Sequence, residues 1–125
     1  MKYLLDTHSL LWTIFEPDKL SAEAQEIILD QNNIIFVSLI SLWEISIKQN
    51  IGRLDIPEEF FEVVRKGGFE MLPLTMPQIE QYRLLPLHHR DPFDRMLIIQ
   101  AREQKLIFIT RDLEISKYDV EIMKV

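Results

Sequence analysis

The chain has 125 residues, a mass of 14.9 kDa and a formal net charge of −6. Its length predicts one domain over residues 1–125, and no apolar run approaches the roughly 18 residues of a membrane span, so we expect no membrane segment. The chain has no cysteine for disulfides or thiolate metal sites, and an acid at position 6 comes too early for a signal peptide, so we expect a cytoplasmic protein.

The first half of the chain alternates between strand-like and helix-like segments. Ser21 is suited to cap a helix and Gly52 to end one. The run at 34–37 is β-branched and aromatic, as in buried strands. We therefore expect strands at 2–5 and 34–37, and helices at 7–15, from Ser21 to the asparagines at 32–33, and through Trp43 to about residue 50.

The second half continues this alternation. Pro57 should begin a helix that the glycines at 67–68 end, and Thr75 and Asp91 are suited to cap the next two helices. We expect these helices to reach about residues 84 and 104, strands at 69–72, 106–109 and near 120–123, and a short helical turn after Asp112. Strands separated by helices predict βαβ units, hence an α/β fold with a parallel sheet covered on both faces.

Four acidic residues follow segments that should approach one edge of this sheet: Asp6, Glu44, Asp94 and Asp112. An open α/β sheet gathers its active-site residues at such an edge. Mutual repulsion would destabilise the cluster unless a cation or protonation relieved it. Oxygen ligands without cysteine favour Mg²⁺ or Mn²⁺, and a bound cation would allow an acidic protein to act on nucleic acid, although the acidic balance argues against broad, non-specific binding.

Each acid also has a purely structural interpretation. Asp6 and Asp112 can cap the elements that follow them, and Asp94 in a first turn is favoured by the helix dipole. Glu44 fits a capping box with a serine at position 41. If the helix begins nearer Ser38 instead, Glu44 lies inside it, and a carboxylate on the inner face needs a partner.

The four acids lie in strings that closely resemble the PIN-domain ribonucleases, and among them the VapC-type toxins of prokaryotic toxin–antitoxin pairs. The strings are YLLDTH at 3–8, Ser38 followed by SLWE at 41–44, HRDPFDR at 89–95 and ITRD at 109–112. The resemblance covers essentially the whole chain. It implies a three-layer α/β/α fold, a Mg²⁺- or Mn²⁺-dependent endoribonuclease, a homodimer and inhibition by a cognate antitoxin. By position Asp6, Glu44, Asp94 and Asp112 match the family's acidic quartet, with Asp91 as an additional contributor.

We expect Asp6, Glu44 and Asp94 to hold one divalent ion and Asp112 to complete its shell or to recruit a second ion. The ion would activate water for in-line attack on an RNA phosphodiester. The family likeness implies 5′-phosphate and 3′-hydroxyl products. The three histidines have no spacing that demands a ligand role, and we assign them no chemistry.

Five further residues are candidates for substrate contacts: Arg90, Arg95, Lys48, Thr7 and Thr110. The two arginines could bind phosphate or balance the neighbouring acids. Lys48 lies one helical turn after Glu44, so it could pair with Glu44 or reach RNA. The two threonines could orient a ligand or a water. Most aromatic side chains, among them Trp12 and Trp43, are expected in the core or in a dimer contact.

Two other hypotheses compete with the nuclease. A phosphoacceptor receiver domain has a similar size and is also acidic and doubly wound. It needs an acidic pair after its first strand, however, and Asp6 has no acidic neighbour. The second alternative keeps the PIN fold as a catalytically inactive binding module. Binding of a divalent ion would separate that module from an enzyme.

Overall fold

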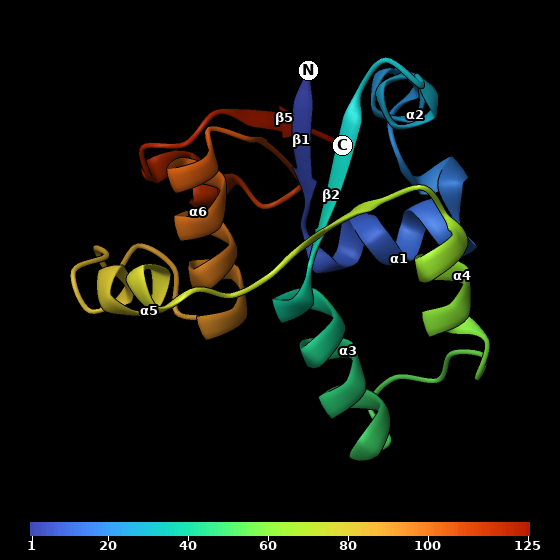
Figure 1. Cartoon of the computed structure of the whole chain (residues 1–125), viewed down its shortest axis with the longest axis horizontal. Coiled ribbons are helices and arrows are strands. Elements are labelled where there is room, and N and C mark those ends of the chain that lie inside the picture. Colours follow the sequence, from blue (N-terminus) through green and yellow to red (C-terminus); the bar gives the residue numbers. More distant parts are fainter.

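The computed structural model describes residues 1–125 and has a five-stranded parallel sheet at its centre (Figure 1). The strand order is β3-β2-β1-β4-β5. The strands are β1 (Lys2–Leu5), β2 (Ile34–Ser38), β3 (Glu70–Leu72), β4 (Ile107–Thr110) and β5 (Ile122–Lys124). In the central register Leu4 of β1 is paired with Phe36 of β2 and with Phe108 of β4.

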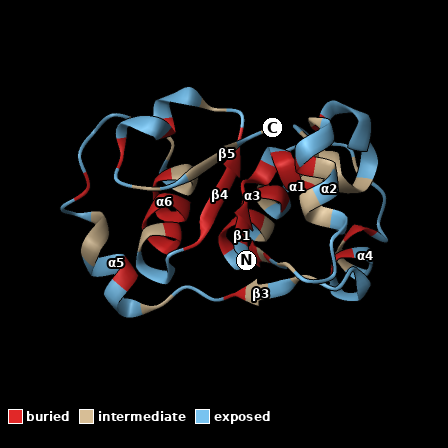
Figure 2. Ribbon diagram, turned by 90° about the horizontal axis from the view of Figure 1, so that it is seen from above, coloured by how far each residue is buried: buried red, intermediate tan, exposed pale blue.

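Six α-helices and two short 3-10 helices connect the strands. They are α1 (Thr7–Phe15), η1 (Pro17–Lys19), α2 (Ala22–Leu29), α3 (Leu39–Asn50), α4 (Phe60–Lys66), α5 (Met76–Tyr82), α6 (Pro92–Gln104) and η2 (Leu113–Lys117). Helices α1, α2 and α4 lie on one side of the sheet, and α5 and α6 lie on the other (Figures 1 and 2). The predicted α/β fold with a parallel sheet between two helical layers is confirmed. No helix combines the length and the apolar character needed to cross a bilayer.

Side-chain alternation along the strands divides the core into two clusters, one on each face of the sheet. Leu4 and Phe108 are fully buried against α6 in the first cluster. Leu5 and Ile109 are buried against Leu10 of α1 in the second cluster. Because both faces of the central strands are covered, β1 and β4 form a rigid base for the residues that follow them.

The predicted helix caps are largely confirmed. Ser21 Oγ accepts a hydrogen bond from the backbone N–H of Ala24, and Thr75 forms a capping box with Gln78. Asp91 Oδ1 accepts from the N–H of Phe93 at 2.8 Å, so α6 begins at the proline that follows this aspartate. Such caps satisfy the donors that a helix leaves unpaired at its first turn.

The structure decides one helix start that the sequence left open between Ser38 and Ser41, and it corrects another. Helix α3 is capped by Ser38, whose Oγ accepts from the N–H of Ile40, so the capping box at Glu44 is wrong and Glu44 lies inside the helix. Helix α4 begins at Phe60 and not at Pro57. The carbonyl of Pro57 instead accepts from the N–H of Phe60 and closes a turn before the helix.

From β1 the chain adds β2 and β3 on one side of the sheet and then β4 and β5 on the other side, so the switch point lies between β1 and β4. In an open α/β sheet the crevice beyond the carboxyl ends of the strands at this switch point is the usual ligand site. Asp6 directly follows β1, and Arg111 and Asp112 directly follow β4. The receiver fold instead has the order 2-1-3-4-5, so the receiver hypothesis is wrong.

Candidate active site

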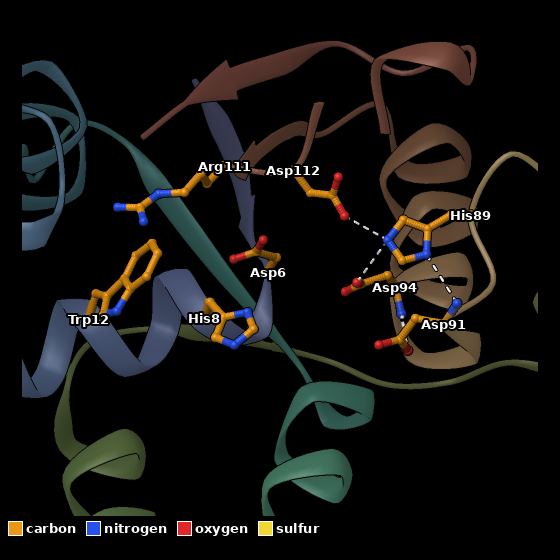
Figure 3. Close-up of a pocket in the computed structure, with 8 residues that line it drawn as sticks. All are labelled: Asp6, His8, Trp12, His89, Asp91, Asp94, Arg111 and Asp112. Carbon is orange, nitrogen blue, oxygen red and sulfur yellow. Dashed lines mark hydrogen bonds and ion pairs between the residues drawn. The ribbon is translucent and has the colours of Figure 1, made fainter. Parts of the chain in front are cut away.

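A cavity of about 490 Å³ opens beside the carboxyl ends of β1 and β4 (Figure 3). Three of the four predicted acids line it, namely Asp6, Asp94 and Asp112, together with Asp91. The first acid comes from the end of β1, the second from α6 and the third from the loop after β4. Residues that lie far apart in the sequence are thus brought to one space by the fold.

Asp6 is both a helix cap and a wall of the cavity. Its Oδ1 accepts from the N–H of Ser9 at 2.7 Å, and its own N–H donates to the carbonyl of Ile109 at 3.1 Å. Burial raises the pKa of Asp6, and hydrogen bonds from Ser9 and Thr110 offset only part of this effect. The side chain forms no ion pair with any basic residue, so its charge is poorly compensated within the chain.

Asp94 lies in the first turn of α6 and is the most perturbed acid of the cavity. Burial is the main cause that raises its pKa to about 7, and the charges of Asp91, Asp6 and Glu44 raise it further. His89 acts in the opposite direction, with its Nε2 at 3.4 Å from Asp94 Oδ2. A carboxyl group with this pKa is only partly ionised near neutral pH unless a cation joins it.

Glu44 is buried, only 4% exposed, and lies just outside the cavity lining. Its Oε1 accepts from the Thr7 hydroxyl at 2.7 Å, and its Oε2 forms an ion pair with Lys48 at 2.8 Å. The predicted need for a partner on the inner face of the helix is therefore met twice. Its charge still reaches Asp94, because it contributes to the raised pKa there.

His89 joins Asp112 to Asp94 across the cavity. Its Nε2 lies 2.7 Å from Asp112 Oδ2, and its Nδ1 accepts from the backbone N–H of Asp91 at 3.0 Å. Since Nδ1 is an acceptor, the ring proton is on Nε2 and is donated to Asp112. This histidine, to which the sequence analysis assigned no chemistry, is thus a central member of the site.

The five predicted substrate residues have different locations. Thr7 and Lys48 hold Glu44, and Thr110 Oγ1 accepts from the N–H of Asp112 at 3.0 Å. Arg90 is exposed and lies outside the cavity lining. Arg95 is also outside the lining, and it is buried.

Arg95 binds backbone carbonyl groups and not an acid. Its guanidinium donates to the carbonyls of Leu85, Pro86 and His89 at 3.0–3.1 Å. Both interpretations from the sequence, phosphate contact and charge balance, assume a group that faces the acids. The structure instead places Arg95 beneath the loop at 85–90, which it holds against α6.

Three further residues line the cavity although the sequence analysis assigned them no role in the site: His8, Trp12 and Arg111. The guanidinium of Arg111 lies over the ring of Trp12, with 4.1 Å between its central carbon and the ring centroid. Trp12 follows Asp6 by six positions, and Arg111 precedes Asp112. Their nearness to the acids in sequence was a usable signal, but the direction of their side chains was not visible in it.

The donor set fits a divalent cation. One oxygen each of Asp94 and Asp112 and Nε2 of His89 all lie within 4.8 Å of one another. Donors that share one ion lie at most about twice the metal–oxygen distance apart, roughly 4–5 Å. The carboxylates of the buried Asp6 and the half-buried Asp94, whose pKa values are raised, gain from such an ion, because it removes their mutual repulsion. Carboxylate oxygens suit Mg²⁺ or Mn²⁺, and His89 orients one of them by donating its Nε2–H to Asp112.

Comparison with known proteins gives one family and one fold. The model of the PIN domain family matches residues 3–121. No curated protein matches the chain.

Solved structures with the same fold cover the chain almost completely. VapBC2 from Rickettsia felis bound to a promoter DNA fragment has a chain with a TM-score of 0.76 and 16% identity, covering 99% of this chain and 98% of its own. DNA-bound VapBC from Salmonella typhimurium gives a TM-score of 0.71 and 21% identity with the same coverage. FitAcB from Neisseria gonorrhoeae gives 0.65 and 19%, over 98% of this chain and 96% of its own.

Proposed function

The chain belongs to the PIN domain family, and on this basis we propose that it is a metal-dependent endoribonuclease that acts as the toxin of a toxin–antitoxin pair. We take residues 1–125 as one domain that works in the cytoplasm. The observation that carries the proposal is the pair of carboxylates of the buried Asp6 and the half-buried Asp94, which face one cavity and have raised pKa values. Carboxyl groups with perturbed pKa values that share a cavity are typical of functional sites.

Asp94 and Asp112 would hold the ion, Mg²⁺ or Mn²⁺, with Asp6 facing it across the same cavity, His89 orienting Asp112 and Glu44 behind them. The chemistry that such an ion supplies is activation of a water and neutralisation of phosphate charge during hydrolysis of the RNA phosphodiester bond. Asp6 and Asp112 follow the ends of β1 and β4, and Asp94 lies in the first turn of α6, so these carboxylates are preorganised for this task.

The chain's own groups orient these acids. Thr7 and Lys48 fix the two oxygens of Glu44, and the Nε2–H of His89 fixes one oxygen of Asp112. Lys48 remains 38% exposed at its side chain, so it can also contact RNA. Thr7, Thr110 and Arg90 stay candidates for substrate contact, and the proposal does not extend to Arg95.

Surface features support protein partners. Eight residues of α3, α5, α6 and the segments beside them form an apolar groove of about 340 Å³: Ile40, Trp43, Leu74, Ile79, Tyr82, Pro92, Phe93 and Met96. The Trp43 side chain is 59% exposed there. An exposed apolar surface of this kind is typical of protein interfaces and supports a homodimer. The resemblance to VapC-type toxins implies a cognate antitoxin, and the chain shares its fold with chains of the VapBC2 and FitAcB structures. The net charge of −6 favours association with a basic antitoxin segment.

The test is hydrolysis of RNA by the purified protein with Mg²⁺ or Mn²⁺. Total RNA is incubated with the enzyme, and new 5′ ends are mapped. Asp94→Asn should lower the rate by more than about a hundredfold, because it removes a metal-binding charge and keeps the side-chain shape. The matched control is Asp119→Asn, which removes the charge of an exposed acid that does not line the cavity.

The outcomes separate the hypotheses. Equal cleavage by Asp94→Asn and wild type would contradict the assigned site. A wild-type protein that neither cleaves RNA nor gains thermal stability with any divalent ion would instead support the inactive binding module.

A further inference from the structure

One wall of the cavity is basic and aromatic, in contrast to its acidic floor. Arg111 lies over Trp12, and His8 is stacked on the same indole with 5.9 Å between ring centroids and 30° between ring planes. All three side chains line the cavity that contains Asp6. In Figure 3 the Arg111 guanidinium lies on the side of Asp6 that faces away from the acids of α6.

Arg111 forms no ion pair although four aspartates line the same cavity. No carboxylate oxygen lies within 4.0 Å of it, and Asp112, its neighbour in sequence, is paired with His89 instead. The guanidinium has one polar contact, from Nη2 to the carbonyl of Lys19 at 3.4 Å. A guanidinium has five N–H donors, so most of those of Arg111 are available to a ligand.

Contact with Trp12 explains why the Arg111 guanidinium lies away from the carboxylates of the cavity. A flexible arginine beside several carboxylates would normally fold toward them, because the Coulomb attraction is strong in a partly buried site. Contact with the indole face holds the guanidinium flat and offsets part of that attraction. The arginine is thus kept apart from the acids at a fixed place across the cavity.

We propose that Arg111 binds a second phosphate of the RNA strand, next to the phosphate that is cleaved, and that Trp12 is a positioning residue for it. The inference rests on the proposed nuclease function. A nucleic-acid strand carries phosphates at a regular spacing, so one phosphate at the acids places its neighbour on a wall of the same cavity. The planar guanidinium matches the geometry of phosphate oxygens with two parallel hydrogen bonds.

The carboxylates of the cavity repel the phosphates of RNA, and this subsite provides an attraction that offsets the repulsion. The other groups that line the cavity are four carboxylates, an indole and two imidazoles, so Arg111 is the one permanently charged cation in the lining that can attract the strand. Because the contact is made equally before and during the reaction, its loss should raise KM more than it lowers kcat. A purely structural arginine would not give this separation.

The test compares Arg111→Gln with Arg83→Gln in the full chain. Arg83 is exposed and lies outside the cavity, so the control makes the same charge change elsewhere. Binding of a labelled single-stranded RNA is followed by fluorescence anisotropy over a series of salt concentrations, and cleavage of the same RNA gives kcat and KM. Thermal melting of each variant checks its fold.

We expect Arg111→Gln to weaken binding by about ten- to a hundredfold, the usual effect of losing hydrogen bonds to a charged group. The slope of log affinity against log salt should fall by roughly 0.7, the value for one phosphate of a single strand. Arg83→Gln should leave both unchanged. Trp12→Leu should reproduce part of the KM effect because it frees Arg111, and Trp12→Phe should restore it.

Each outcome is decisive. If Arg111→Gln cleaves and binds RNA like Arg83→Gln, the subsite is overturned while the nuclease stands. If wild type binds RNA without cleaving it, the nuclease proposal fails, and the salt slope still decides the subsite. If Arg111→Gln loses only the binding of a protein partner, or if wild type neither binds nor cleaves RNA, the subsite is overturned as well.

Discussion

Tyr118 and Arg95 donate hydrogen bonds to the same backbone oxygen, the carbonyl of Pro86, at 2.7 Å and 3.0 Å. The Tyr118 hydroxyl also accepts from the N–H groups of His88 and His89 at 3.0 Å and 2.8 Å. One residue from the segment after η2 and one from α6 thus fix the loop that brings His89 to the cavity. The position of His89 thus depends on two side chains that do not line the cavity.

The first prediction concerns this loop. Tyr118→Phe removes the hydroxyl and should lower the free energy of unfolding by about 1–3 kcal/mol, because two partly buried N–H groups lose their acceptor and the Pro86 carbonyl loses a donor. Cleavage of RNA should fall with it, since His89 is less well held. Tyr82→Phe is the matched control, because the Tyr82 hydroxyl forms no hydrogen bond within the protein while its ring packs against Arg95. Urea unfolding of both variants measures the difference, and equal values would contradict the assigned role.

The second prediction concerns stability and pH. The pKa of Asp94 is raised to about 7 from the ordinary value of 3.8, so the folded state holds a proton that the unfolded state has lost between these two values. In EDTA this contribution to stability is fully present below pH 3.8 and is lost as pH rises toward 7. Asp94→Asn should remove that dependence and should be more stable than wild type near pH 8.

Thermal melting in EDTA at several pH values measures the effect. The difference between wild type and Asp94→Asn isolates this one carboxyl from other titrating groups, and Asp119→Asn should keep the wild-type slope. A difference that does not change between pH 4 and pH 8 would contradict the raised pKa.

The third prediction concerns the metal. Mn²⁺ and Mg²⁺ should raise the melting temperature of wild type, because an ion that binds only the folded state stabilises it by mass action. His89→Asn should weaken the binding of both ions by about ten- to a hundredfold, because Asp112 loses the hydrogen bond that orients its carboxylate toward the ion. Titration calorimetry of both ions decides this, and unchanged affinities would contradict the orienting role of His89.

The fourth prediction concerns the ion pair behind the cavity. Lys48→Met leaves the buried Glu44 carboxylate with Thr7 as its one partner and should cost about 1–3 kcal/mol of stability. Glu44→Gln in the same chain should recover part of that loss, because a neutral amide needs no cation. Urea unfolding of the two single variants and the double variant forms the cycle, and strictly additive values would show that the pair does not interact.

Local signals in the sequence were sufficient for most of the elements and for the meeting of three acids. The cap at Asp91 and the proline after it fix the start of α6, and with it the position of Asp94. Such signals act over a few residues, and the structure confirms them because no tertiary contact opposes them.

What the sequence did not disclose depends on contacts between distant segments. Ser38 and Ser41 are both good caps, and Ser38, which caps the helix, also donates its hydroxyl to Gln100 of the distant helix α6. Arg95 lies next to an acid in sequence, but the unpaired carbonyls of the loop at 85–90 bind it more fully. No local pattern shows which of two polar groups an arginine will reach.

The union of β1 with β4 joins segments a hundred residues apart, as in the contact of the Ser9 hydroxyl with the Ile109 carbonyl. While the ribosome makes this protein, β2 and β3 can pair with β1 early, but β1 keeps one edge vacant until β4 emerges. Asp112 and Arg111 leave the ribosome later still. The cavity beside the strand ends is therefore incomplete until the chain has been made as far as Asp112.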